Sequence, residues 1–340
     1  MNQKLLSLIV PAYQSEDYLS RCVDTLLLGG DEVEILLVND GSIDKTAEII
    51  EGYAQRHPGM VRVFHQENQG HGGAVNTGIS NATGLYTKVV DSDDWLDGDA
   101  FQSLLEHIRL MRLNKECVDL LVWNYVYERD GKRNKRVVRY GGVFPENQTV
   151  TWNETGRFAL GQYLLMHSMV LKTQVILDSE LRLPIHCFYV DNLYAFNTLP
   201  RVKTIRYLNL DLYRYYIGRE DQSVQEKVMI RRIDQQIKVN KLMIDQTQKL
   251  DEVPGKLRVY LLHYLQIITT VTLVMLTFAR TQEANEKKAE LWAYLQQKNP
   301  QVHSLFKRNL MGLLAKSRRK TTYWLIRFLY TVARKHYGFN

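Results

Sequence analysis

Cysteine is scarce in this sequence of 340 residues, and the three that occur, Cys22, Cys117 and Cys187, lie far apart. They form no C-x-x-C pair, so neither a disulfide framework nor a zinc site is indicated. The first residues run into a short apolar segment that has no small-residue cleavage site, unlike a signal peptide. These absences predict a protein of a reducing, cytoplasmic compartment.

Two glycine motifs are also absent. No G-x-G-x-x-G follows the first apolar run, and no G-x-x-x-x-G-K-[ST] occurs. The dinucleotide-binding and P-loop interpretations therefore lose their main support.

Acidic residues are missing from the last forty positions, which hold nine Lys and Arg residues. The net charge of the whole chain is +7, so the preceding 300 residues sum to −2. The basic character therefore belongs to the C-terminal tail, which makes the tail the candidate for an acidic partner.

Apolar runs rich in β-branched residues predict strands at residues 5–10, 33–38, 61–65 and 87–90. Segments with helical spacing separate them, the third at residues 74–81. This alternation predicts an α/β, Rossmann-like fold, with a mostly parallel central sheet and helices on both faces. From Ser223 onward the pattern is helical. We therefore expect a first domain at residues 1–222 and an all-helical C-terminal domain at residues 223–340.

Polar segments follow the end of each predicted strand, where ligands bind in such sheets. Each segment alone has an ordinary structural interpretation. Asp40 stands in a turn-rich Asn-Asp-Gly-Ser run, Tyr13 is suited either to stacking on a base or to closing the sheet edge, and glycines 70, 72 and 73 suit a tight turn as well as a phosphate. Their shared position favours a ligand site.

An acidic cluster follows the fourth strand and contains Asp91, Asp93 and Asp94. Carboxylates this close repel one another, and hard cations such as Mg²⁺ or Mn²⁺ prefer carboxylate oxygens. The alternative is a polar loop in which Asp94 or Asp97 caps the next helix.

Four segments carry a resemblance to a known family, in the order VPAYQSEDYL, LLVNDGSIDKT, ENQGHGGAVNTGI and VVDSDDWLD. Residues 5–225 resemble the bacterial family 2 glycosyltransferases of GT-A fold that act in cell-wall or surface polysaccharide synthesis. The resemblance implies transfer of a sugar from a nucleotide-sugar, usually UDP-linked, with inversion at the anomeric carbon.

The resemblance also implies roles for individual residues. Asp93 corresponds to the direct ligand of Mn²⁺ or Mg²⁺, and Asp91 to a carboxylate near the ribose or the metal's water shell. The implied donor-binding set is Pro11, Tyr13, Asp40, Asn68, Gly70, Asp91, Ser92 and Arg219.

Two positions depart from the family pattern. Gln14 stands where Asn is common, and Val75 stands where many members have an Arg near the phosphates. The phosphate charge must then be met by another cation, for which His71, Lys88 and Arg219 are candidates.

Asp191 is the candidate catalytic base, because it follows aromatic and apolar residues and matches the family's position for that carboxylate. A role as N-cap of the helix predicted at 193–199 is the structural alternative. Asp178 and Asp211 are the other candidates for the base.

The tail contains an apolar stretch at residues 259–278 that is about as long as a membrane span. Its His, Gln and Thr residues favour a helix buried in the tail itself, and this apolar region also suits a homodimer interface. Near the C-terminus, aromatic and aliphatic residues alternate with Lys and Arg, which is typical of a helix on an anionic membrane surface. No nucleic-acid-binding signature accompanies the basic residues.

The sequence thus predicts a metal-dependent, UDP-sugar-using glycosyltransferase, cytoplasmic and peripheral on the inner face of the membrane, with a glycan, lipid-linked or wall-polymer acceptor. The alternative is a non-catalytic, glycosyltransferase-like partner subunit of a glycan-synthesis complex. A nucleotidyltransferase is disfavoured, because the first strand is followed by Pro11-Ala12-Tyr13-Gln14 rather than a basic, glycine-rich triphosphate loop.

Overall fold

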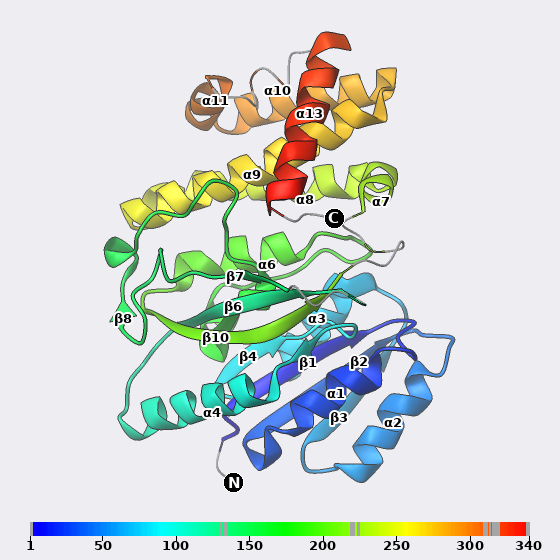
Figure 1. Cartoon of the computed structure of the whole chain (residues 1–340), viewed down its shortest axis with the longest axis vertical. Helices are drawn as coiled ribbons and strands as arrows, with labels where there is room; N and C mark the ends of the chain where they lie inside the picture. Colours follow the sequence, from blue (N-terminus) through cyan, green and yellow to red (C-terminus); the bar gives the residue numbers. More distant parts are fainter. Residues whose placement is uncertain are drawn as a thin grey trace. The chain divides into compact units, whose positions relative to one another are not determined.

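The structure is a computed structural model that describes residues 3–129, 131, 135–217, 222, 225–308, 312, 314 and 320–337. The chain divides into two compact units, Met1–Tyr216 and Ile217–Asn340. Figure 1 shows that the first unit is built on a sheet and the second from helices.

Ten strands of the described residues join in one sheet, in the order β3-β2-β1-β4-β9-β6-β10-β5, with β7 beside β6 and β8 beside β10. Their bounds are β1 Leu6–Ala12, β2 Val33–Asp40, β3 Val61–Gln66, β4 Tyr86–Val89, β5 Trp95–Leu96, β6 Leu120–Glu128, β7 Arg136–Val138, β8 Thr149–Val150, β9 Met169–Lys172 and β10 Ile205–Tyr216.

The first four strands are mutually parallel, as are β6 and β10. Strand β9 runs antiparallel between β4 and β6, and β5, β7 and β8 are also antiparallel to their neighbours. The predicted α/β class with a mostly parallel sheet is confirmed. The antiparallel strands are short and lie beyond β4 in the strand order.

Six α-helices accompany the sheet in the described part of the first unit: α1 Leu19–Leu27, α2 Thr46–Arg56, α3 Gly70–Asn81, α4 Gly98–Leu113, α5 Thr173–Asp178 and α6 Asp191–Thr198. Right-handed crossovers place α1 and α2 on one face and α3 on the other, because the chain reverses direction across the sheet after β3. Helix α3 begins at Gly70, four residues earlier than predicted, so the glycine-rich run is helical rather than a loop.

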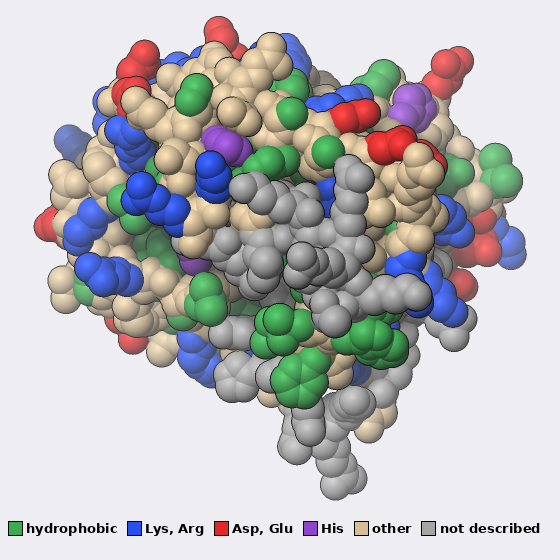
Figure 2. All heavy atoms as spheres, turned by 90° about the horizontal axis from the view of Figure 1, so that it is seen from above, with side chains coloured by type: hydrophobic (Ala, Val, Ile, Leu, Met, Phe, Trp, Pro, Cys, Tyr) green, Lys and Arg blue, Asp and Glu red, His purple; other side chains and the backbone are tan. Residues whose placement is uncertain are grey.

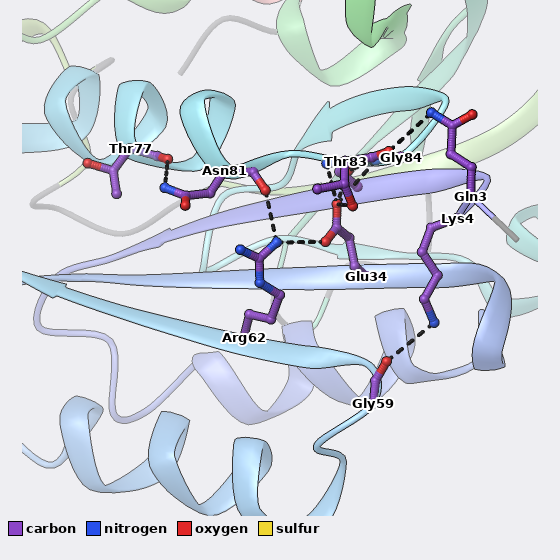
Figure 3. Close-up of polar contacts among 10 residues, drawn as sticks. Gln3, Lys4, Glu34, Gly59, Arg62, Thr77, Asn81, Thr83 and Gly84 are labelled. Carbon is purple, nitrogen blue, oxygen red and sulfur yellow. Dashed lines mark hydrogen bonds and ion pairs between the residues drawn. The ribbon is translucent and has the colours of Figure 1, made fainter. Parts of the chain in front are cut away.

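A buried carboxylate joins the amino ends of the parallel strands (Figure 3). Oε1 of Glu34 accepts hydrogen bonds from Ser7 Oγ at 2.5 Å and from Thr83 N at 2.6 Å. Its Oε2 pairs with Arg62 Nη1 at 3.0 Å, and Arg62 also donates to Asn81 O at 2.9 Å. This network links β1, β2 and β3 to the connection that leads into β4, at the edge of the sheet opposite the acidic cluster.

The second unit contains α7 Glu226–Arg231, α8 Ile233–Gln246, α9 Gly255–Ala279, α10 Gln282–Lys298, α11 Pro300–Lys307 and α13 Lys320–Tyr337 among its described helices. Helix α9 is long and apolar enough to cross a membrane, but most of its apolar window is buried within the protein. Its threonines have partners there, since Asn240 Nδ2 donates to Thr269 Oγ1 at 3.0 Å. The burial agrees with the prediction of a core helix.

Candidate active site

The strand order places the predicted polar segments side by side, because β3, β2, β1 and β4 are neighbours and share one carboxyl edge. Pro11 is buried in β1 opposite Val38, and Tyr13 follows with about half of its surface exposed, at 52%. Asp40 ends β2, Asn68 follows β3 and Asp91 follows β4. The structure therefore brings these predicted donor-binding residues to one edge.

Asp40 organises the neighbouring loop. Its Oδ1 accepts hydrogen bonds from Gln66 Nε2 at 2.7 Å and from the backbone N–H of Gln69 at 2.8 Å, while Asn68 Nδ2 donates to the Asp40 carbonyl at 2.9 Å. Asp40 is almost fully buried, so these bonds compensate for the desolvation of its carboxylate. They also fix the start of α3.

The acidic cluster forms a turn in which the N–H of Asp94 donates to the carbonyl of Asp91 at 3.0 Å. Asp94 points into the protein, where it accepts from Tyr213 Oη at 2.7 Å and from the N–H of Tyr216 at 2.8 Å. Asp97 caps α4 through the N–H of Ala100. The contacts of Asp94 and Asp97 are therefore those of residues that shape the turn.

Asp91 is held by a histidine. Oδ1 of Asp91 lies 2.9 Å from Nε2 of His71 on α3. Burial opposes ionisation of Asp91, but the hydrogen bond and charge of His71 lower the pKa of this carboxyl to about 2. The same bond outweighs the effect of burial on His71 and raises its pKa. Beside this pair, Ser92 Oγ and Ser15 Oγ share a hydrogen bond of 2.8 Å.

A second histidine faces Asp91 from the far side. Nδ1 of His167 is 3.9 Å from Oδ2 of Asp91. Its ring stacks on Tyr213 at a centroid distance of 4.7 Å and is tilted against Tyr215 at 4.4 Å. This nitrogen is buried and has no hydrogen-bond partner among the described residues. Burial lowers the pKa of His167 to about 4, so the ring is neutral and its nitrogen can ligate a metal.

Residues 166–172 resemble a family strand beneath the acceptor site, but the resemblance gives His167 no role. It precedes β9, and only the antiparallel pairing of β9 with β4 brings it to the acidic turn. His167, Asp91 and Asp94 form a group whose possible metal-ligand atoms all lie within 4.8 Å of one another.

Asp191 is the first residue of α6, while Val190 occupies the N-cap position, so the N-cap interpretation is wrong for Asp191. Burial raises the pKa of Asp191 to about 6; the charge of His71 opposes this rise, and that of Asp91 adds to it. Asp191 therefore shares the electrostatic environment of the acidic turn. The other two candidates are placed differently, since Asp178 is exposed on α5 and Asp211 pairs with Arg139 at 2.8 Å.

The residues predicted to supply a positive charge near the phosphates lie in different places. Lys88 is buried, donates to the carbonyl of Met166 and faces the ring of Tyr213 at 4.6 Å, so it does not extend to a ligand at the edge. Val75 is buried on α3. Arg219 lies outside the described residues. Of the predicted candidates, His71 is the one that the structure places against the acidic turn. Arg21, which is not among those candidates, also contacts the turn, because its Nη2 donates to the carbonyl of Asp93 at 3.0 Å.

Residues 7–173 match the family model of glycosyl transferase family 2. An uncharacterized glycosyltransferase of Bacillus subtilis, EpsJ, is 43% identical over 111 residues, which are 32% of this chain and 32% of EpsJ. Chondroitin synthase of Escherichia coli is 33% identical over 142 residues, which are 42% of this chain and 20% of that enzyme. The matched part thus spans a third or less of either relative's length.

Among solved structures, TarS residues 1–349 of S. aureus superimpose with a TM-score of 0.69 at 19% identity, covering 97% of this chain and 92% of that one. A structure of the same TarS segment in complex with UDP-GlcNAc gives a TM-score of 0.67 at 18% identity.

The fold and its carboxylate-rich edge thus define a GT-A fold followed by a helical region, as the sequence predicts. Within that class, residues 7–173 belong to glycosyl transferase family 2.

Proposed function

We propose that the protein is a metal-dependent inverting glycosyltransferase that moves a sugar from a UDP-sugar to a glycan, lipid-linked or wall-polymer acceptor. The observation that carries the proposal is the position of His71, which bonds to the acidic turn and also senses the charge of the proposed base, Asp191. His71 contacts Asp91 at 2.9 Å, and its pKa responds to the charges of both Asp91 and Asp191. The acidic turn and the proposed base therefore share one electrostatic environment around His71.

The residues at the turn fit a divalent cation. Asp91 and His167 belong, with Asp94, to a group whose ligand atoms lie within 4.8 Å of one another, and Nδ1 of His167 has no hydrogen-bond partner among the described residues. The direct metal contact is assigned to Asp93, in the same turn, from the family resemblance. Carboxylates suit Mg²⁺ and Mn²⁺ alike, whereas an added imidazole suits a transition metal and therefore favours Mn²⁺. When bound, such a cation neutralises negative charge on the diphosphate of the leaving nucleotide.

Asp191 acts as the base in this proposal. The acceptor hydroxyl must lose its proton as its oxygen attacks the anomeric carbon, and that proton passes to the Asp191 carboxylate. A pKa of about 6 suits the task, because the group is mostly ionised at neutral pH and still basic enough to take the proton. The bond to the nucleotide breaks on the opposite face of the sugar, which gives inversion.

UDP is the proposed nucleotide. Tyr13 follows β1, Asp40 ends β2 and Asn68 follows β3, at the edge of the sheet where the family resemblance puts the uridine. The UDP-GlcNAc complex of TarS, a protein of the same fold, supports a UDP-linked donor.

The metal role is tested by binding of UDP to Asp93→Ala, measured by isothermal titration calorimetry with Mn²⁺ and with excess EDTA. The wild type is expected to bind UDP at least tenfold more tightly with Mn²⁺, and the variant is expected to lose this gain. Asp99→Ala is the matched control, because Asp99 is an exposed carboxylate on α4. Metal-dependent binding of equal strength in Asp93→Ala contradicts the assignment.

The base is tested separately with Asp191→Asn, which preserves the side chain's size. UDP affinity should stay within about twofold of the wild type, whereas transfer should fall by about 100-fold or more, as expected for loss of a general base. A near-normal transfer rate in this variant assigns the base to another group.

We also propose that α13 binds an anionic membrane surface on the cytoplasmic side, where a lipid-linked acceptor is presented. Its exposed apolar residues form one strip, Trp324, Leu325, Phe328 and Leu329, while Ile326 faces inward. Figure 2 shows hydrophobic side chains gathered on the face viewed from above. The last forty residues add nine positive charges and no negative ones, and each such charge near an anionic leaflet contributes about 1 kcal/mol.

The membrane proposal predicts flotation of the full chain with vesicles that contain phosphatidylglycerol, but not with vesicles of phosphatidylcholine alone. The double variant Trp324→Ser and Phe328→Ser should lose flotation while UDP affinity is retained. Equal flotation with both vesicle types contradicts the electrostatic part of the proposal. The same apolar strip also suits a homodimer, which would show in the mass by light scattering without lipid.

A further inference from the structure

The glycines at the start of α3 contact protein backbone. A Cβ atom placed on Gly72 would lie 2.5 Å from the carbonyl oxygen of Pro184, and one on Gly70 would lie 3.2 Å from Cα of His186. Gly70 also has φ of +76°, a conformation that other residues rarely adopt. The missing side chains therefore make room for residues 183–187, which belong to the segment that leads into Asp191.

Hydrogen bonds hold this segment on α3. The side chain of Asn76 pairs with the backbone of Leu183 in both directions, through Nδ2 to the carbonyl at 2.8 Å and through Oδ1 to the N–H at 3.0 Å. Three residues further on, the N–H of His186 donates to the carbonyl of Gln69 at 2.6 Å. Leu183, Cys187 and Val190 are buried.

Gln69 connects two parts of the site through its own peptide groups. Its N–H donates to Oδ1 of Asp40 at 2.8 Å, and its carbonyl accepts from His186. Asp40 belongs to the proposed uridine pocket, and His186 lies five residues before the proposed base. One residue thus bridges the donor pocket and the segment that carries Asp191.

We propose that Gln69, Gly70, Gly72 and Asn76 form a seat for residues 183–190, and that this seat positions Asp191 relative to the bound donor. Gln69, Gly72 and Asn76 are positioning residues, since they act through the backbone of the segment. Gly70, which the family resemblance also places in the donor-binding set, contacts the same segment. The inference rests on the proposed function for its kinetic consequence but not for the existence of the seat. It also explains why a glycine-rich run stands at the start of a helix, where glycine lowers helix stability by up to about 1 kcal/mol per residue.

The size of the effect follows from the geometry at Gly72. Ordinary contact between a Cβ and an oxygen begins near 3.4 Å, so alanine at this position must push the Pro184 carbonyl away by about 1 Å. Displacements of about 1 Å in a catalytic constellation cost up to about 100-fold in rate. We therefore expect Gly72→Ala to lower kcat by about 10- to 100-fold, with UDP affinity within twofold of the wild type.

The experiment compares the full-length wild type, Gly72→Ala and Gly52→Ala. Gly52 lies in the middle of α2, and a Cβ there would meet only Arg56 Nη1 at 3.6 Å, so this variant is the matched control. Hydrogen–deuterium exchange is followed on peptides that cover residues 183–190, and kcat, KM and UDP affinity are measured in parallel. Asn76→Ala removes the seat's side-chain bonds without adding atoms and should show the same pattern.

Faster exchange at residues 183–190 in Gly72→Ala and Asn76→Ala, with a reduced kcat and unchanged UDP affinity, is the expected result. Unchanged exchange in both variants would overturn the seat itself. Faster exchange with a wild-type kcat would overturn the positioning role. If the wild type turns over no UDP-sugar, the proposed function fails, while the exchange data still decide whether the seat exists.

Discussion

Replacing Tyr213 by Phe is expected to loosen the acidic turn without disturbing its surroundings. The hydroxyl of Tyr213 donates to Oδ2 of Asp94 at 2.7 Å and accepts from the N–H of Asp91 at 3.2 Å. Phenylalanine keeps the ring that stacks on His167 and faces Lys88. The substitution therefore removes one hydrogen bond at each end of the turn, at Asp91 and at Asp94, and little else.

The cost can be calculated from these contacts. Tyr213 is fully buried, so no water replaces its hydroxyl easily. Burial and the charges of Asp93 and Asp91 raise the pKa of Asp94, so the worth of its bond lies between that of a neutral bond, about 1 kcal/mol, and that of a charged bond, about 1.5–3 kcal/mol. The bond to the peptide N–H adds about 1 kcal/mol. Allowing for partial relaxation, we expect the free energy of unfolding to fall by about 2–3 kcal/mol. UDP affinity in the presence of Mn²⁺ should also fall by about tenfold, because Asp91 and Asp93 lose their fixed geometry.

Urea unfolding followed by tryptophan fluorescence measures the first effect, and calorimetry of UDP binding measures the second. Tyr86→Phe is the control, since Tyr86 is also buried and donates to a carbonyl, that of Val118, at 2.7 Å. It should cost about 1 kcal/mol and leave UDP affinity unchanged. If the two variants behave alike in both assays, Tyr213 does not organise the turn.

Three further results are expected. Glu34→Gln should lower the free energy of unfolding by about 2 kcal/mol at pH 7. Burial opposes ionisation of Glu34, but its hydrogen bonds lower its pKa below 4.5. The stabilisation is therefore present above pH 4.5 and is lost as the pH falls through the lowered pKa. Acid titration of the wild type and the variant should show their stabilities converging, and a constant difference would refute the reasoning. The rate of transfer should rise with pH through about 6 and then level off, because Asp191 must be ionised to accept a proton; a rate that is flat from pH 5 to 8 would contradict this. Asp97→Ala should cost about 1–2 kcal/mol in urea unfolding, since it removes the cap of α4 and the 2.6 Å pair with Arg214, whereas the exposed Asp99→Ala should be near neutral.

The local patterns of the sequence predict the parallel half of the sheet, because each of its strands is a short apolar run that ends in polar residues. They also predict that Asp40, Asn68 and Asp91 share an edge, since the carboxyl ends of neighbouring parallel strands meet. The sequence predicts the start of α3 four residues too late, because glycine is a poor helix former. The glycines at this start make room for residues 184 and 186, more than a hundred positions away in the sequence.

His167 shows the same limit. The resemblance of residues 166–172 to a family strand gives His167 no role as a ligand, and its position depends on β9 entering the sheet between β4 and β6. Lys88 is the opposite case. Its place one residue before the end of β4 suggests a phosphate ligand, but its side chain is buried. Long-range pairing decides both cases, and periodicity carries no information about it.

The most direct test of the proposed function is the initial rate of UDP release from a panel of UDP-sugars by the full-length protein, with Mn²⁺ and with excess EDTA. At least one UDP-sugar should be hydrolysed slowly with Mn²⁺ present, and this release should stop with EDTA and in Asp93→Ala. No release above the protein-free control from any UDP-sugar would contradict the proposed enzyme and favour a non-catalytic partner of a glycan-synthesis complex.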